Sequence, residues 1–104
     1  MDRIIERGML YDFYGELLTD HQREVYEGLV DNDMSLGELA GEYNISRQAA
    51  HDLIKRCDKM LENYEDKLHL ISKFQSIRSK AEEIDRVSSD ALVKELASRI
   101  LEEI

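Results

Sequence analysis

The chain has 104 residues, with 14 lysines and arginines against 23 aspartates and glutamates, which gives a formal net charge of -9 at pH 7. This length suits one domain, and 42% hydrophobic residues is enough for a core. The lack of proline and the single cysteine, Cys57, exclude collagen, proline-rich linkers and internal disulfide scaffolds. No apolar run approaches the roughly twenty residues that a membrane span needs, and the N-terminus does not read as a signal peptide. We therefore expect a cytoplasmic protein with no membrane contact.

The pattern of apolar residues predicts an all-α fold, because steps of three and four recur from the first residues onward. Capping boxes at Thr19 to Gln22 and Ser35 to Glu38 mark two further helix starts. The expected helices cover residues 2–17, 20–30, 36–43, 46–72 or beyond, and 89–104.

Residues 35–56 carry the pattern of a helix-turn-helix. Two helical segments flank a short turn around Asn44, a residue type that tolerates the left-handed backbone closing a helix, and Ser46 can cap the helix that follows. Small residues, Ala40 and Ala50, stand where the two helices must cross closely. Caps, turn length and small residues agree on one motif.

The segment LLTDHQREVYEGLVDNDMSLGELAGEYNISRQAAHDLIKR resembles region 4 of bacterial sigma factors, in which a helix led by L-T-x-x-Q-R-E-V precedes a helix-turn-helix. Over most of the chain the sequence is more similar to the YlxM family of helix-turn-helix proteins. The residues that carry this similarity are Tyr11-Asp12-Phe13-Tyr14, Leu18-Thr19, Ser35-Leu36-Gly37-Glu38, Asn44-Ile45-Ser46-Arg47-Gln48-Ala49 and Ile54-Lys55-Arg56. The resemblance implies an all-helical, dimeric protein. It also implies a link to the signal recognition particle pathway that rests on gene neighbourhood.

A heptad spacing from Ala50 onward predicts a long helix and a homodimer. Within a single domain of residues 1–104, we expect a sigma region 4-like helix-turn-helix unit at 17–63 and a helical dimerisation extension at 64–104. The dimer interface is expected at five residues of the stripe, with the terminal helix packing across it: Cys57, Leu61, Tyr64, Leu68 and Ile71. The heptad register fails near Ser72 to Ser79, where we expect a bend or break, and Ser88-Ser89 is expected to cap the last helix.

Within the helix-turn-helix unit, net positive charge is found only in the second helix of the motif. Residues 17–63 hold 5 basic and 10 acidic residues, whereas residues 46–59 hold four basic residues against Asp52 and Asp58, a local +2. The exposed start of this helix meets base edges in proteins of this kind. The expected nucleic-acid contacts are Ser46, Arg47, Gln48, His51, Lys55 and Arg56. Because phosphate neutralisation dominates affinity, we expect DNA binding to be weak and salt-sensitive.

Two functions follow from the sequence. The first is a regulatory DNA-binding protein, in which Arg47 reads a guanine or a phosphate, Gln48 an adenine, and Lys55 and Arg56 the phosphates. The alternative is a non-enzymatic accessory factor of the signal recognition particle pathway that binds its protein or RNA, with the basic residues as an ordinary solvated face. No enzyme, cofactor or metal is expected, since the sequence has no glycine-rich phosphate loop, HExxH or CxxC. For Cys57, packing is a better explanation than a reactive thiol.

Overall fold

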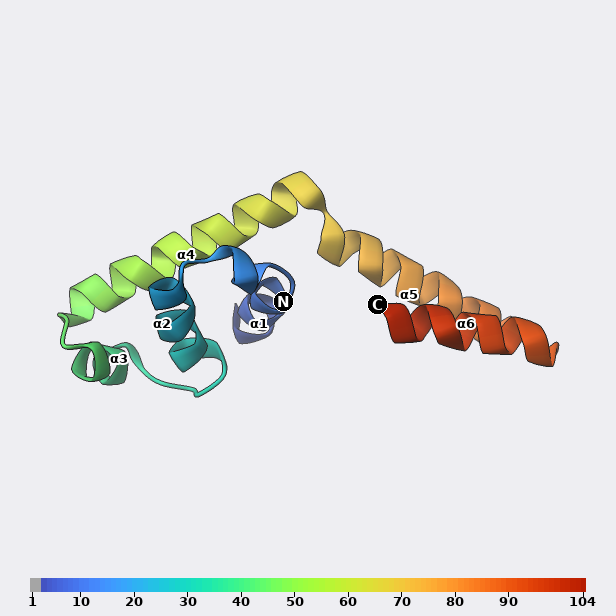
Figure 1. Ribbon diagram of the computed structural model, residues 1–104, viewed down its shortest axis with the longest axis horizontal. Coiled ribbons are helices and arrows are strands. Elements are labelled where there is room, and N and C mark those ends of the chain that lie inside the picture. The colour runs from blue at the N-terminus through green and yellow to red at the C-terminus, as the bar shows by residue number, and fades with distance from the viewer. Residues whose placement is uncertain (1–2) are drawn as a thin grey trace. The chain divides into compact units, whose positions relative to one another are not determined.

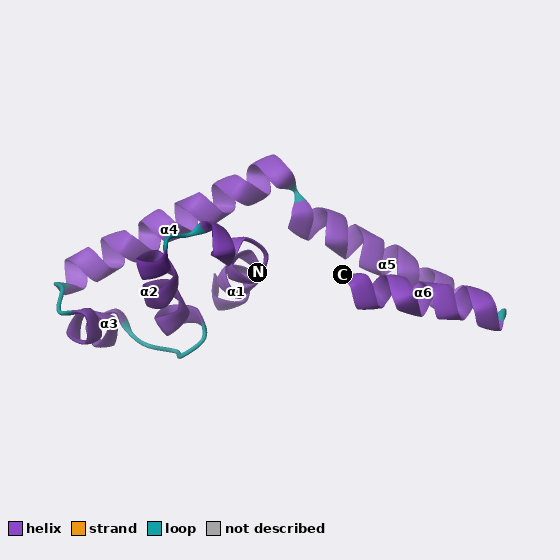
Figure 2. Ribbon diagram, viewed as in Figure 1, coloured by secondary structure: helices purple, strands orange, loops and turns teal. Residues whose placement is uncertain are grey.

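The computed structural model describes residues 3–104, which form six α-helices and one 3-10 turn and contain no β-strand (Figure 1; Figure 2). The elements are α1 (Arg3–Tyr14), η1 (Gly15–Leu17), α2 (Asp20–Val30), α3 (Leu36–Tyr43), α4 (Arg47–Leu68), α5 (Leu70–Val87) and α6 (Ala91–Glu103). The all-α prediction is confirmed. The chain divides into two compact units, the first ending at Leu68 and the second spanning His69–Ile104. Among the described residues, no helix combines the length and the apolar character needed to cross a bilayer.

The helix starts agree with the sequence better than the helix ends do. Both capping boxes form: Thr19 and Ser35 each accept a hydrogen bond from a backbone N–H three residues later, and the Gln22 and Glu38 side chains return the contact. The first helix was expected to run from residue 2, which lies outside the described residues, to residue 17. It ends instead at Tyr14, and a 3-10 turn follows.

The first unit is built around α4, against which α1, α2 and α3 pack. Its innermost side chains are fully buried, and they come from three of these helices: Val25, Tyr26, Leu39, Ala50, Cys57 and Leu61. The close approach of α2 and α3 requires Gly28, because a Cβ atom there would lie 2.7 Å from Cδ2 of the buried Leu39. The first compact unit ends at Leu68 and includes α1, so it is larger than the helix-turn-helix unit expected at 17–63.

The five residues expected at the dimer interface have different surroundings in the structure. Cys57 and Leu61 are fully buried in the core of their own unit, so a second chain cannot reach them. Tyr64 is half-buried, with its ring centroid 6.0 Å from that of Tyr14 in α1. Leu68 is exposed at the end of α4, and Ile71 belongs to the other unit. A heptad repeat marks a buried seam, and here much of that seam is filled by α1 and α2 of the same chain.

The long helix breaks at His69, earlier than the expected Ser72 to Ser79. His69 adopts a left-handed conformation, φ 57° and ψ 27°, which interrupts the hydrogen-bond ladder between α4 and α5. The His69 carbonyl then accepts hydrogen bonds from the Lys73 N–H and the Ser72 hydroxyl, so the new helix starts at once. The helix expected over 46–72 or beyond therefore ends early, at Leu68, and residues 3–104 form six α-helices where five were expected.

The second unit is an antiparallel helical hairpin. Ala81 of α5 and Ala97 of α6 are its buried residues, and they allow the two helices to approach closely. The cap of α6 is Asp90, whose carboxylate accepts hydrogen bonds from the N–H groups of Leu92 and Val93. The expected Ser88-Ser89 cap is wrong by one residue; the Ser88 hydroxyl instead accepts from the Asp90 N–H.

Candidate nucleic-acid interface

The turn between α3 and α4 has the geometry of a helix-turn-helix. Asn44 closes α3 in the left-handed conformation, φ 54° and ψ 46°, and its N–H donates to the Ala40 carbonyl. The N–H of Ile45 donates to the same carbonyl at 3.0 Å. The Ser46 hydroxyl accepts from the Ala49 N–H at 3.0 Å and so caps α4. The sequence predictions for Asn44 and Ser46 are confirmed.

The residues expected to contact nucleic acid lie on the first three turns of α4, most of them in solvent. The exposed residues are Ser46, Arg47, Gln48, Lys55 and Arg56, and His51 is half-buried. Gln48 and His51 both lie beside Asp52. The Gln48 amide donates a hydrogen bond to the Asp52 carboxylate at 2.9 Å, and His51 Nδ1 lies 3.6 Å from the same carboxylate. A nucleobase would have to compete with Asp52 for the Gln48 amide. Arg47, Lys55 and Arg56 take part in none of the ion pairs found among residues 3–104.

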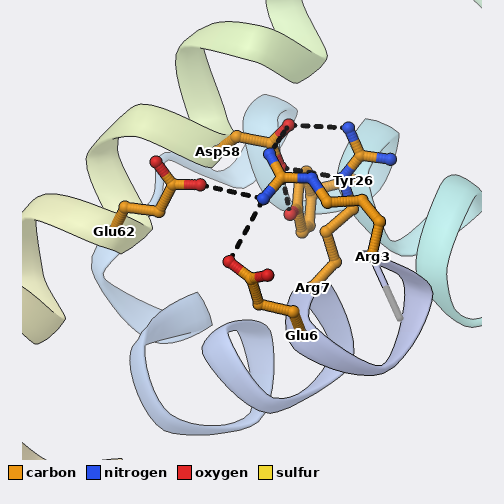
Figure 3. A network of polar contacts seen from close by, with 6 residues as sticks. All are labelled: Arg3, Glu6, Arg7, Tyr26, Asp58 and Glu62. Carbon is orange, nitrogen blue, oxygen red and sulfur yellow. Dashed lines mark hydrogen bonds and ion pairs between the residues drawn. The ribbon is translucent and has the colours of Figure 1, made fainter. Parts of the chain in front are cut away.

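A buried carboxylate on the inner side of α4 ties this helix to α1 and α2 (Figure 3). Asp58 is only 4% exposed. Its two oxygens accept hydrogen bonds from Arg7 Nε at 3.0 Å and Nη2 at 2.7 Å, a bidentate pair. The Tyr26 hydroxyl donates to Asp58 at 2.6 Å, and Arg3 reaches the same carboxylate at 3.0 Å. Arg3 also bonds Glu62 one turn further along α4, at 2.9 Å.

These contacts decide the charge states inside the network. Burial opposes ionisation of Asp58, but hydrogen bonds from Arg7 and Tyr26 and the charges of Arg7 and Arg3 outweigh it, so the pKa of Asp58 is lowered. Burial and the hydrogen bond to Asp58 raise the pKa of Tyr26. Asp58 is therefore a carboxylate and Tyr26 a neutral donor at physiological pH. The adjacent Cys57 thiol is also buried, which raises its pKa to about 11.

The network changes the charge that α4 shows to solvent. The sequence count of +2 for residues 46–59 set four cations against Asp52 and Asp58. Asp58 points inward and is neutralised by arginines of α1, so the exposed surface carries four cations against one acid, a local +3. We call this the cationic surface of α4, made of Arg47, Lys55, Arg56 and Lys59.

Sequence reasoning missed the roles of Arg3, Arg7 and Tyr26, although a signal was present. Asp58 comes four residues after Ile54 and three before Leu61, so it falls on the buried side of the helix. An acid at such a position needs a cationic or hydrogen-bonding partner. Which cation supplies it depends on how α1 packs, and the sequence does not show that.

A groove of about 700 Å³ adjoins the cationic surface within the first unit. Apolar residues from three helices line it, namely Leu29, Leu36 and Ile54, together with Lys55, Arg56 and Lys59 of α4. Arg3, Arg7, His51, Asp58 and Glu62 complete the lining. The groove therefore combines apolar surface with positive charge. Among residues 3–104, no three His, Cys, Asp or Glu side chains gather in a way that could hold a metal ion.

Two helices joined by a short turn, of which the second is capped and exposed at its start, define a helix-turn-helix protein. The family model described as "Putative helix-turn-helix protein, YlxM / p13 like" (UPF0122) matches residues 1–100, and the chain belongs to this family. The resemblance to the YlxM family stated from the sequence is thereby confirmed.

Relatives in this family cover most of the chain. A UPF0122 protein of Shouchella clausii is 43% identical over 101 residues, which is 96% of this chain and 93% of that protein. One of Halalkalibacterium halodurans is 42% identical over 97% of this chain and 89% of its own length. One of Acetivibrio thermocellus is 48% identical over 81% of this chain and 72% of its own. The names of these relatives state no substrate or partner.

Proposed function

We propose that the protein is a regulatory DNA-binding protein that reads duplex DNA with the start of α4. The observation that carries the proposal is the +3 cationic surface on the second helix of a helix-turn-helix, in a chain whose net charge is -9. Positive charge is retained where a duplex would dock, and the acid that would have weakened it is turned inward.

The expected contact of each side chain depends on its position along α4. Arg47 and Ser46 stand at the start of α4, where base edges and the nearest phosphates lie in this class of complex. Lys55 and Arg56 follow two to three turns later, at about 12 Å along the helix, and contact phosphates. Gln48 pairs with adenine only after leaving Asp52. The surrounding acidic surface opposes every approach, so we expect weak and strongly salt-dependent binding.

The test is a fluorescence-anisotropy titration with duplex DNA at several salt concentrations. The variant Arg47→Ala/Arg56→Ala is compared with Arg86→Ala/Arg99→Ala, which removes the same charge from exposed arginines of the second unit. Each phosphate contact contributes about 0.9 to the slope of log K against log salt. We expect the first variant to lower that slope by about 2 and the second to leave it unchanged.

Two results would contradict the proposal. One is the absence of duplex binding by the wild-type protein even at low salt. The other is an equal loss in both variants, because a general change of net charge would then explain the binding and the surface of α4 would not.

The groove supports a second candidate, the non-enzymatic accessory factor of the signal recognition particle pathway. Its apolar lining by Leu29, Leu36 and Ile54 suits a protein segment better than a phosphate backbone. A pull-down from lysate with and without nuclease separates the two functions. Nuclease-resistant capture of a targeting-particle protein favours the accessory factor, and capture that nuclease abolishes favours nucleic acid, with RNase and DNase used in separate arms.

A further inference from the structure

We infer that the groove beside α4 binds an acidic amphipathic helix of a partner protein, and that this helix and duplex DNA exclude each other from α4. The groove is the cavity of about 700 Å³ in the first unit, a volume within the range that proteins use for ligands. Binding of the partner helix does not depend on the proposed function, whereas the exclusion of DNA rests on it.

The lining of the groove carries an excess of positive charge. Five of its residues are lysines or arginines and two are acids, Asp58 and Glu62, which gives a net charge of +3 with histidine counted as neutral. Both acids are already bonded to arginines of α1. The remaining cations are exposed and take part in none of the ion pairs among the described residues: Lys55, Arg56 and Lys59. A partner that complements this charge brings carboxylates.

The apolar part of the lining requires apolar side chains from the occupant as well. Ile54 of α4 is only 3% exposed, and Leu29 of α2 and Leu36 of α3 are half-buried, so three helices each contribute one apolar side chain. Covering the two leucines removes further apolar surface from water, which favours binding. A sugar-phosphate backbone has no apolar side chains with which to cover them. The occupant is therefore amphipathic, with apolar residues beside its acids.

The groove favours a helical occupant over an extended one. Its lining residues come from helices, and no β-strand occurs among residues 3–104, so an extended segment finds no sheet edge with which to pair its backbone. A helix satisfies its own backbone hydrogen bonds. From His51 to Glu62 the lining follows α4 for about 16 Å, the length of about three turns of a helix lying alongside it.

The groove and the cationic surface of α4 share residues. Lys55 and Arg56, which contact phosphates in the proposed function, also line the groove. A bound acidic helix neutralises these cations and places its own carboxylates beside them, and both effects oppose the approach of a phosphate backbone. The partner helix is therefore a competitive regulator of DNA binding.

The test is a fluorescence-anisotropy titration of the full chain against designed peptides. The first is a helix of about fourteen residues, with leucines spaced by three and four along one face and glutamates on either side of them. The second has lysine in place of glutamate, and the third has glutamine in place of leucine. We expect micromolar binding of the first peptide that weakens with salt, and no binding of the other two.

Variants of the chain locate the binding site. Lys55→Ala/Lys59→Ala should weaken binding of the first peptide roughly five- to tenfold. Lys73→Ala/Lys80→Ala removes the same charge from exposed lysines of the second unit and should leave the binding unchanged. Leu36→Gln should weaken it roughly tenfold through the lost apolar contact, and circular dichroism shows whether this variant keeps its helices.

Four results would count against the inference. It would be overturned by a wild-type protein that does not bind the first peptide, or by an equal loss in both lysine variants. Equal binding of the peptide without leucines would also overturn it, because the groove would then be only part of an anion-binding surface. In a competition arm the first peptide should displace labelled duplex, and a complex that holds both would overturn the exclusion. If the wild type binds no duplex, the exclusion falls with the proposed function, whereas the direct peptide titration still decides the groove.

Discussion

Replacing Asp58 by asparagine tests whether the inner network fixes α4 in place. The substitution keeps the shape and removes the charge. Breaking a buried ion pair by removing one partner costs about 3–5 kcal/mol. The value here should fall to about 2–4 kcal/mol, because the Arg3 and Arg7 side chains are 44% and 23% exposed and can turn toward water. Tyr26, which is fully buried, keeps only a weaker neutral acceptor.

Urea unfolding followed by circular dichroism measures this change. The matched control is Glu62→Gln, which removes an acid from the same arginine cluster at a site 40% exposed, and it should cost under about 1 kcal/mol. A double-mutant cycle between Asp58→Asn and Arg7→Gln should give a coupling of about 1–3 kcal/mol.

The same pair of proteins gives a pH test. The folded pKa of Asp58 lies below its unfolded value, so its stabilisation is present above about pH 4 and is lost as the pH falls through the folded pKa. The stability difference between wild type and Asp58→Asn should therefore shrink below about pH 4. The reasoning would be refuted by a variant as stable as Glu62→Gln, or by a stability difference that stays constant on acidification.

Two further predictions concern single side chains in the first unit. Ser46→Ala removes the hydroxyl that caps α4 and should lower the free energy of unfolding by about 1 kcal/mol. Ser35→Ala, which removes the cap of α3, is the comparison variant. A loss under about 0.3 kcal/mol for Ser46→Ala would count against the cap. Cys57 should resist thiol reagents at pH 8 in the native protein and react on unfolding in urea, because it is fully buried and burial raises its pKa to about 11. The stabilisation that comes from keeping this thiol protonated should decline as the pH rises from about 9 through 11. Rapid labelling of the native protein would contradict the burial.

Features set by a few neighbouring residues could be predicted from the sequence. The caps at Thr19, Ser35 and Ser46 need only a side-chain oxygen and a backbone N–H three residues away. The left-handed Asn44 is similarly local. The break at His69 carries no such clear signal. Neither proline nor glycine is present there, and although histidine tolerates positive φ better than most residues, a single histidine in a helical pattern does not mark a break.

Features set by packing could not be predicted in the same way. A stripe containing Cys57 and Leu61 is apolar whether a second chain or α1 covers it, so periodicity alone could not choose between a dimer seam and a core. The charge count failed for the same reason. Counting treats Asp58 as part of the surface, whereas the fold pairs it with arginines some fifty residues earlier in the chain.

The two sides of α4 are therefore connected through charge. Had Asp58 faced outward, the four cations of this helix would share their surface with two acids, and Arg3 and Arg7 would remain as separate charges on α1. By drawing Asp58 inward, the network uses these arginines to hold α4 against α1 and leaves Asp52 as the one acid facing the cationic surface within residues 46–59. In an acidic chain, the position of one carboxylate thus sets both the anchoring of the second helix and the charge it offers to a polyanion.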